Sequence, residues 1–241
     1  MRVSLIFLLF TFLINSSYSQ IENPENSTGN WLMYFGTHSI NQKWSIHSEF
    51  QMRLYEPFGN FNQMLPRVGL NYHIDKNSMV TAGYAWIPTQ GTFIPNIIDG
   101  EKNISIENRI WQQFILKNKI KRFNFEHRYR LEQRWVSRNN FTDYLNRVRY
   151  RLLLTIPINN NVLKDKTFFL SFYDEIFLNI TDTPFDQNRL YAALGYKFNS
   201  YVAIQAGYLR HRLGSQKLNR LQLGVFLNTK RKSKEKVKMN S

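Results

Sequence analysis

The stretch 123–135 alternates apolar and polar residues, with the polar set rich in Arg and Glu, and this pattern constrains the fold more than any other feature of the chain. The two sets are Phe123, Phe125, His127, Tyr129, Leu131, Gln133 and Trp135 against Asn124, Glu126, Arg128, Arg130, Glu132 and Arg134. A period of two residues indicates a β-strand with two unlike faces. The stretch 43–54 alternates in the same way.

Eleven such segments follow one another along the chain. We predict strands at 31–38, 43–54, 64–74, 78–86, 104–117, 123–135, 144–156, 167–180, 188–198, 201–212 and 219–229. Most reach the ~9–11 residues that a tilted transmembrane strand needs. The chain is therefore predicted to be all-β, an antiparallel transmembrane β-barrel of about ten to twelve strands. Because single-chain bacterial barrels have even strand numbers, ten strands with an accessory arm at Trp31 and twelve with an irregular first strand stay open.

The N-terminus carries the pattern of a secretory signal peptide. Arg2 precedes an apolar run at 3–14, and the small residues Ser16, Ser17 and Ser19 follow. We predict cleavage after Ser19. The run is shorter than the ~20 apolar residues of a membrane-anchoring helix. The expected division is a signal peptide at 1–19, an outer-membrane β-barrel at 20–229 and a basic, disordered tail at 230–241.

The composition agrees with export to the bacterial outer membrane. There is no cysteine, which excludes a disulfide framework and thiolate chemistry. Aromatic residues make up 15% of a chain whose formal net charge is +15. Membrane barrels combine these traits by alternating lipid-facing and lumen-facing positions. A soluble exported β-protein that binds an anionic polysaccharide is the alternative, since alternation does not distinguish lipid from a second sheet.

The connections and the last strand bear on the same interpretation. Connections alternate between shorter and longer segments, with shorter ones at 75–77, 118–122 and 199–200 and longer ones at 56–63, 88–103, 137–143, 181–187 and 213–218. The connection at 157–166 departs from this order, and the loop at 88–103 is expected to fold over a pore or meet a ligand. The apolar stripe Leu221, Leu223, Val225 and Leu227 resembles the C-terminal strand that the barrel-assembly machinery reads. That machinery and outer-membrane lipid are the expected partners, and the basic tail is solvated or binds anionic lipid or a periplasmic partner.

The inward face of the predicted barrel carries more cations than carboxylates. Twelve cations and five carboxylates have the inward parity: Arg53, Arg67, Arg109, Arg128, Arg130, Arg134, Arg147, Arg149, Arg151, Arg189, Lys197 and Arg220, with Glu49, Glu107, Glu126, Glu132 and Glu175. The candidates for binding an anion in the lumen are Arg128, Arg130, Arg134, Arg147, Arg149, Arg151 and Arg189, with Glu126, Glu132 and Glu175 as carboxylate partners. Trp111 and Ile115 share the face of Glu107 and Arg109, so 104–117 alternates less cleanly.

Two interpretations of this inward face stay open. Arginine and glutamate can neutralise one another in a narrow interior that side chains fill, which makes the set a structural network. Alternatively the excess of arginine attracts an anion, since rings of Arg and Lys select anions in pores.

Several blocks resemble the exported family of Gram-negative bacteria known as domain of unknown function 2490 (DUF2490). They are Trp31, Lys43-Trp44-Ser45, Tyr173-Asp174-Glu175-Ile176-Phe177-Leu178-Asn179, Phe185-Asp186-Gln187-Asn188-Arg189-Leu190-Tyr191 and Gly195-Tyr196. The resemblance covers nearly the whole chain after the signal peptide and implies an outer-membrane β-barrel. It implies no activity and no catalytic residues.

An enzyme is the main rival class. Outer-membrane lipid hydrolases place a His and a Ser two residues apart on a lipid-facing strand, and none of the five histidines is followed by Ser at that spacing. Ser45, His47 and Glu49 share a face in the reverse order, but that face is predicted to be the lumen. No spacing typical of a metal or nucleotide site occurs, and no cofactor or nucleic acid is expected.

These observations favour a porin-like outer-membrane barrel that forms a small or plugged, anion-favouring pore for a small anionic solute. The alternative is a non-conducting barrel with a structural, ligand-binding or adhesive role. A lipid-modifying enzyme is the weakest interpretation.

Overall fold

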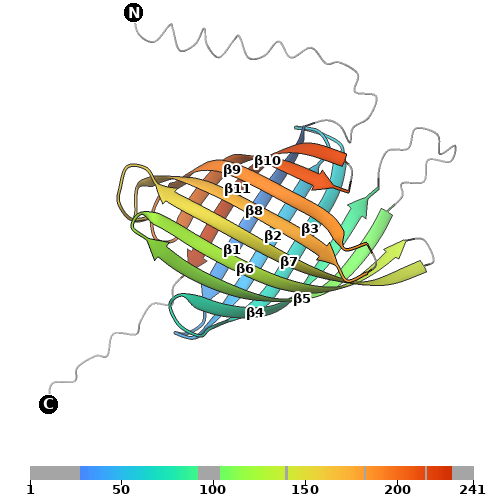
Figure 1. Ribbon diagram of the computed structural model, residues 1–241, viewed down its shortest axis with the longest axis horizontal. Helices are drawn as coiled ribbons and strands as arrows, with labels where there is room; N and C mark the ends of the chain where they lie inside the picture. Colours follow the sequence, from blue (N-terminus) through green and yellow to red (C-terminus); the bar gives the residue numbers. More distant parts are fainter. Residues whose placement is uncertain (1–27, 92–103, 139–140, 182, 215, 230–241) are drawn as a thin grey trace, which may run out of the picture.

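The computed structural model describes residues 28–91, 104–138, 141–181, 183–214 and 216–229. Its strands are β1 (Gly29–Ser39), β2 (Trp44–Leu54), β3 (Phe61–His73), β4 (Ser78–Gln90), β5 (Ile104–Ile120), β6 (Phe123–Arg138), β7 (Phe141–Pro157), β8 (Thr167–Asn179), β9 (Phe185–Lys197), β10 (Val202–Leu213) and β11 (Gln216–Thr229). They form one closed barrel in which each strand pairs with its neighbours in the chain (Figure 1). The predicted all-β barrel is confirmed, and the described strands number eleven.

The barrel closes through a single parallel pair. β1 pairs in parallel with β11, where Gly29 lies opposite Arg220 and His38 opposite Thr229. All other neighbours are antiparallel, so the expectation of antiparallel pairing is wrong at this one seam. The reason is parity: when an odd number of strands runs up and down in turn, the first and last strands point the same way and close in parallel.

Because β1 and β11 are parallel, the first residue of β1 and the last residue of β11 lie at opposite rims of the barrel. We call the rim where β1 begins the Gly29 rim and the rim where β11 ends the Thr229 rim. The Thr229 rim carries the connections 40–43, 74–77, 121–122, 158–166 and 198–201. The longest of these, 158–166, interrupts the predicted alternation of loop lengths at the expected place.

Two of the expected long loops are mostly strand. β6 and β7 continue to Arg138 and Phe141, and β10 and β11 continue to Leu213 and Gln216, so the loops predicted at 137–143 and 213–218 are wrong. Strand pairing continues through these segments, and Ser137 and Thr142 are register partners whose hydroxyl groups lie 2.8 Å apart. Most of the loop at 88–103, the predicted signal peptide and the basic tail lie outside the described residues.

The two faces of the sheet are reversed relative to a water-soluble protein. Outward side chains are large and apolar, and Val68 is 53% exposed and Leu190 56%. Inward side chains include charged residues that are almost fully buried, with Arg130 at 2% and Glu132 at 1%. The alternation of two unlike faces therefore places apolar groups outside and charges inside. The described part of the chain has no helix suited to crossing a membrane.

Candidate functional site in the lumen

The lumen encloses a cavity of about 500 Å³. Its lining extends from Gln63 and Gln187 near the Gly29 rim to Lys117 and Asn228 near the Thr229 rim. Most of the residues that line it are polar or charged, and cations outnumber carboxylates among them. The cavity is the place where an anion or another small polar solute meets the inward side chains.

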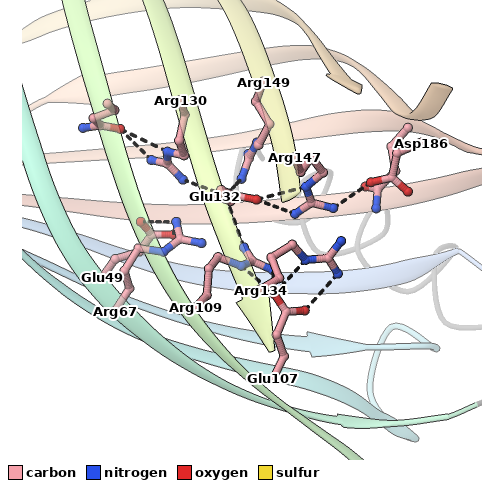
Figure 2. Close-up of polar contacts among 12 residues, drawn as sticks. Glu49, Arg67, Glu107, Arg109, Arg130, Glu132, Arg134, Arg147, Arg149 and Asp186 are labelled. Carbon is pink, nitrogen blue, oxygen red and sulfur yellow. Dashed lines mark hydrogen bonds and ion pairs between the residues drawn. The ribbon is translucent and has the colours of Figure 1, made fainter. Parts of the chain in front are cut away.

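Glu132 on β6 lies at the centre of the most highly connected charge cluster (Figure 2). Its Oε1 lies 2.6 Å from Arg149 Nη1, 3.3 Å from Arg109 Nη1 and 3.8 Å from Arg130 Nη1, and its Oε2 lies 2.6 Å from Arg147 Nη2. These arginines come from β5, β6 and β7, which are adjacent in the barrel. A single buried carboxylate therefore holds four guanidinium groups, whose charge exceeds its own.

The other inward carboxylates each bind arginine as well. The closest N···O distances are 2.9 Å for Glu49 and Arg67, 2.6 Å for Glu107 and Arg109, 2.6 Å for Glu126 and Arg151, and 2.6 Å for Glu175 and Arg128. Glu107 also accepts two hydrogen bonds from Arg134, and Glu175 also pairs with Arg149 at 2.7 Å. Because buried charges need partners, these pairs stabilise the interior whatever the barrel does.

Six of the seven candidate cations lie within ion-pair distance of a carboxylate. They are Arg128, Arg130, Arg134, Arg147, Arg149 and Arg151. Arg147 also reaches Asp186 at 2.7 Å, a partner that alternation alone does not identify. The seventh candidate, Arg189, forms no ion pair with any carboxylate of the described residues. The candidate set thus contains two chemically different groups.

One of the paired candidates, Arg130, lies beside an indole ring, in a group that we call the Trp111 cluster: Trp111, Arg67, Arg130 and His47. The guanidinium carbons of Arg130 and Arg67 lie 4.8 and 5.6 Å from the ring centroid, and the His47 ring meets it edge-on at 5.5 Å. Glu49 binds both Arg67 at 2.9 Å and His47 at 3.1 Å. Cation–π contacts and the carboxylates of Glu49 and Glu132 together stabilise the buried cations of this cluster.

A second indole has the same surroundings, and we call this the Trp31 cluster: Trp31, Arg53, Arg189 and His211. The guanidinium carbons of Arg53 and Arg189 lie 3.8 and 4.9 Å from the Trp31 ring centroid, and the His211 ring meets it edge-on at 5.7 Å. The four residues come from β1, β2, β9 and β10, close to the Gly29 rim.

Glutamines take the place of glutamates around the Trp31 cluster. Arg53 donates to Gln51 Oε1 and Gln63 Oε1, both at 2.7 Å, and Arg189 donates to Gln187 Oε1 at 3.1 Å. Neither arginine forms an ion pair within the described part of the chain. Arg189 Nε is buried without a hydrogen-bond partner there. Two nearly buried guanidinium groups therefore have no carboxylate of the described residues within ion-pair distance.

The two tryptophans and the glutamines are not among the candidate residues predicted from the sequence. Gln51 and Gln187 have the same parity as Arg53 and Arg189, so alternation assigns them to the lumen. It does not reveal that strands at opposite ends of the chain meet at Trp31.

The contacts of Ser45 and His47 also differ from those that their shared strand face suggests. His47 does contact Glu49, but Ser45 Oγ meets His73 Nε2 at 2.8 Å instead of His47. Among the described residues, no group of His, Asp and Glu side chains is arranged to hold a metal ion.

Comparison with known proteins gives a family and no activity. A family model described as "Protein of unknown function (DUF2490)" matches residues 28–222, which include all of β1 to β10. No curated protein and no solved structure matches the chain.

Proposed function

The chain belongs to the DUF2490 family of proteins of unknown function, and we propose that it is an outer-membrane β-barrel whose lumen favours small anions. The family description supplies no activity, so the proposal depends on the barrel itself. Its main support is the reversed arrangement of a closed sheet, which is apolar outside and cationic inside.

The outer face has the chemistry that a lipid bilayer requires. Large apolar side chains are exposed on strands all around the barrel, including Val68, Ile110, Phe172 and Leu223. A water-soluble protein rarely exposes apolar patches of more than a few hundred Å². The described residues form one closed sheet with no second sheet over this face, which leaves lipid as the natural cover.

Aromatic pairs near both rims add a second line of support. Near the Thr229 rim, the Trp44 and Tyr72 rings pack with centroids 4.8 Å apart. Near the Gly29 rim, the Trp135 and Tyr144 rings pack at 5.2 Å. Aromatic girdles at the two membrane interfaces are typical of outer-membrane barrels, because these rings are apolar with a polar edge.

The anion preference is supported above all by the Trp31 cluster. Arg53 and Arg189 line the cavity of about 500 Å³, and neither has a carboxylate of the described chain within ion-pair distance. Guanidinium groups bind carboxylate and phosphate oxygens through paired N–H donors, and rings of arginine select anions in pores. An anion from solution supplies the counterion that the glutamines do not.

Conductance in a planar lipid bilayer tests the proposal. The refolded protein is expected to give stable steps, and a salt gradient is expected to give a reversal potential of the anion-selective sign. Replacing both Arg53→Gln and Arg189→Gln should reduce the anion preference. The matched control is Arg210→Gln, which removes the same charge from an exposed residue on the outer face of β10.

Three results would contradict the proposal, each in a different way. Failure of the protein to float with lipid vesicles would remove the membrane placement. Insertion without conductance would remove the pore and leave the arginine network structural. An equal loss of selectivity in the Arg210→Gln control would remove the role assigned to the Trp31 cluster.

A further inference from the structure

The outer face carries a group of polar side chains that the lumen does not explain. Ser48 on β2 lies between Tyr34 and His38 of β1, all three with outward parity. Ser48 Oγ lies 2.8 Å from His38 Nε2 and 3.2 Å from Tyr34 OH. The Tyr34 hydroxyl also lies 3.2 Å from His38 Nε2. A serine hydroxyl in hydrogen-bond contact with an imidazole is the pairing that activates a nucleophile.

The backbone leaves space for this group at Gly36. Gly36 lies opposite Ser48 in the β1–β2 register. A Cβ placed on Gly36 would overlap Ser48 Oγ, the Tyr34 hydroxyl and His38 Nε2. The three polar groups therefore converge over a position that only glycine leaves open.

His38 is oriented by a residue across the parallel seam. Its Nδ1 lies 3.2 Å from the hydroxyl of Thr229, which is its register partner on β11. If Nδ1 carries the proton and donates a hydrogen bond to the Thr229 hydroxyl, Nε2 is free to accept a hydrogen bond from the Ser48 hydroxyl. This is the tautomer that a general base needs toward a serine.

An apolar groove begins beside Ser48 on the same outer face. It has a volume of about 350 Å³, and its outward-facing lining includes Tyr34, Ser48, Phe50, Val68, Tyr84 and Trp86. Glu49 and Arg67, which have inward parity and pair with each other at 2.9 Å, also line it. A hydrocarbon chain lying in this groove would place its head end near the Ser48 hydroxyl. The groove thus supplies what an acyl substrate requires next to a nucleophile.

We propose that Ser48 is the nucleophile of a site that hydrolyses the acyl ester of a glycerophospholipid arriving from the surrounding membrane, with His38 as the general base. The lipid substrate rests on the membrane placement proposed above. The nucleophile itself rests only on the side chains of β1, β2 and β11.

The reaction balances with water as the second reactant. Ser48 Oγ attacks the ester carbonyl carbon while His38 Nε2 takes the hydroxyl proton, and the Tyr34 O–H donates toward the oxyanion. The carbon–oxygen bond to the glycerol breaks, and His38 returns its proton to that oxygen. Water then attacks the acyl–Ser48 ester with His38 again accepting a proton, which releases the fatty acid and restores the serine hydroxyl.

The same strand contains a matched control. Ser45 Oγ also lies 2.8 Å from a histidine Nε2, that of His73, but Ser45 faces the lumen and is 1% exposed. It also accepts a hydrogen bond from Asn71. The two serine–histidine pairs have the same separation, but Ser45 is buried on the lumen side, whereas Ser48 lines the apolar groove on the outer face.

Covalent labelling combined with lipid hydrolysis tests the proposal on the refolded full chain. A fluorophosphonate probe is expected to add to the peptide containing Ser48 in the unmodified protein and in Ser45→Ala, and not in Ser48→Ala. Fatty acid release from phosphatidylglycerol in mixed micelles should disappear in Ser48→Ala. His38→Gln should lower that release by about 100-fold or more, which is the usual contribution of a general base.

Two further measurements separate the possible failures. Gly36→Ala should abolish labelling while the heat-dependent shift in gel mobility of a folded barrel is kept. Absence of labelling and of fatty acid release in the folded protein, or equal labelling of Ser48→Ala, would overturn the site. Labelling of Ser48 with hydrolysis of a short-chain water-soluble ester, in a protein that fails to float with vesicles, would keep the nucleophile and overturn the lipid substrate and the membrane placement.

Discussion

The Trp111 and Trp31 clusters have the same plan and different counterions. Each places two guanidinium groups and one histidine edge around an indole ring. Around Trp111, Arg67 binds Glu49 at 2.9 Å, and Arg130 lies 3.8 Å from Glu132 while it donates to Gln113 Oε1 at 2.7 Å. Around Trp31, both arginines donate to glutamines and neither has a carboxylate of the described residues within ion-pair distance. Glutamate and glutamine have nearly the same size, so the two clusters differ mainly in charge.

This difference separates two tasks that buried arginines perform. Where a carboxylate is present, the arginine is held by charge-assisted hydrogen bonds and has little affinity left for a solute. Where a neutral amide is present, the arginine is positioned but its charge is not cancelled. The Trp111 cluster is accordingly expected to stabilise the barrel, and the Trp31 cluster to bind an anion.

The largest effect is expected when the central glutamate is made neutral. Glu132→Gln leaves four guanidinium groups around an uncharged amide, and loss of one partner from a buried ion pair costs about 3–5 kcal/mol. The change in the free energy of unfolding is measured by unfolding the protein in lipid vesicles with urea while tryptophan fluorescence is recorded. The control is Glu126→Gln, because Glu126 is partly exposed, with 20% of its side chain accessible. Equal losses in the two variants would contradict the stabilising role of the four arginine contacts of Glu132.

A second variant tests packing around Trp111 without changing any charge. A Cβ added to Gly83 would lie 2.6 Å from Trp111 Cζ2 and would overlap the Val68 carbonyl oxygen. Gly83→Ala should therefore lower the free energy of unfolding by about 1–3 kcal/mol, as overpacking usually does.

Its control is Gly59→Ala in the β2–β3 connection. There the closest atom to the added Cβ, within the described structure, is Glu56 Oε2 at 3.5 Å. Anion selectivity should remain unchanged in both variants. A change in selectivity with Gly83→Ala would mean that the Trp111 cluster also takes part in conduction.

The composition of both clusters is largely readable from the sequence, and their assembly is not. Strict alternation assigns Arg53, Arg130 and Arg189 to the inward face, because a strand has only two faces. Which residues touch depends on the stagger between neighbouring strands and on how the barrel closes. Trp31 and Arg189 are brought together by the parallel β1–β11 seam and the β9–β10–β11 ladder, which no local pattern encodes.

The outward serine–histidine group also depends on the pairing of strands, here of two strands that are neighbours in the chain. A search for His and Ser two residues apart on one strand misses Ser48 and His38, which lie ten positions apart on a hairpin. The signal that would find them is the pairing of 31–38 with 43–54 through the short connection between them. That pairing places Gly36 opposite Ser48 and His38 beside it.

The smallest and most specific prediction converts the Trp31 cluster toward the Trp111 type. Gln187 Oε1 lies 3.1 Å from Arg189 Nη2 and 3.0 Å from His211 Nε2, so Gln187→Glu supplies a carboxylate where the amide already accepts. Charge-assisted hydrogen bonds are roughly twice as strong as neutral ones, and we expect a gain of about 1 kcal/mol in the free energy of unfolding.

The same variant should lower the anion preference of the lumen, because the new carboxylate occupies the place of the solute anion. Gln205→Glu is the control, since Gln205 donates to the Tyr191 hydroxyl at 3.0 Å rather than accepting from an arginine. It adds the same charge to the lumen and should reduce stability. If Gln187→Glu gained stability but kept the full anion preference in bilayer recordings, the anion would have to bind away from Arg189, and the distinction between the two tryptophan clusters would apply to stability alone.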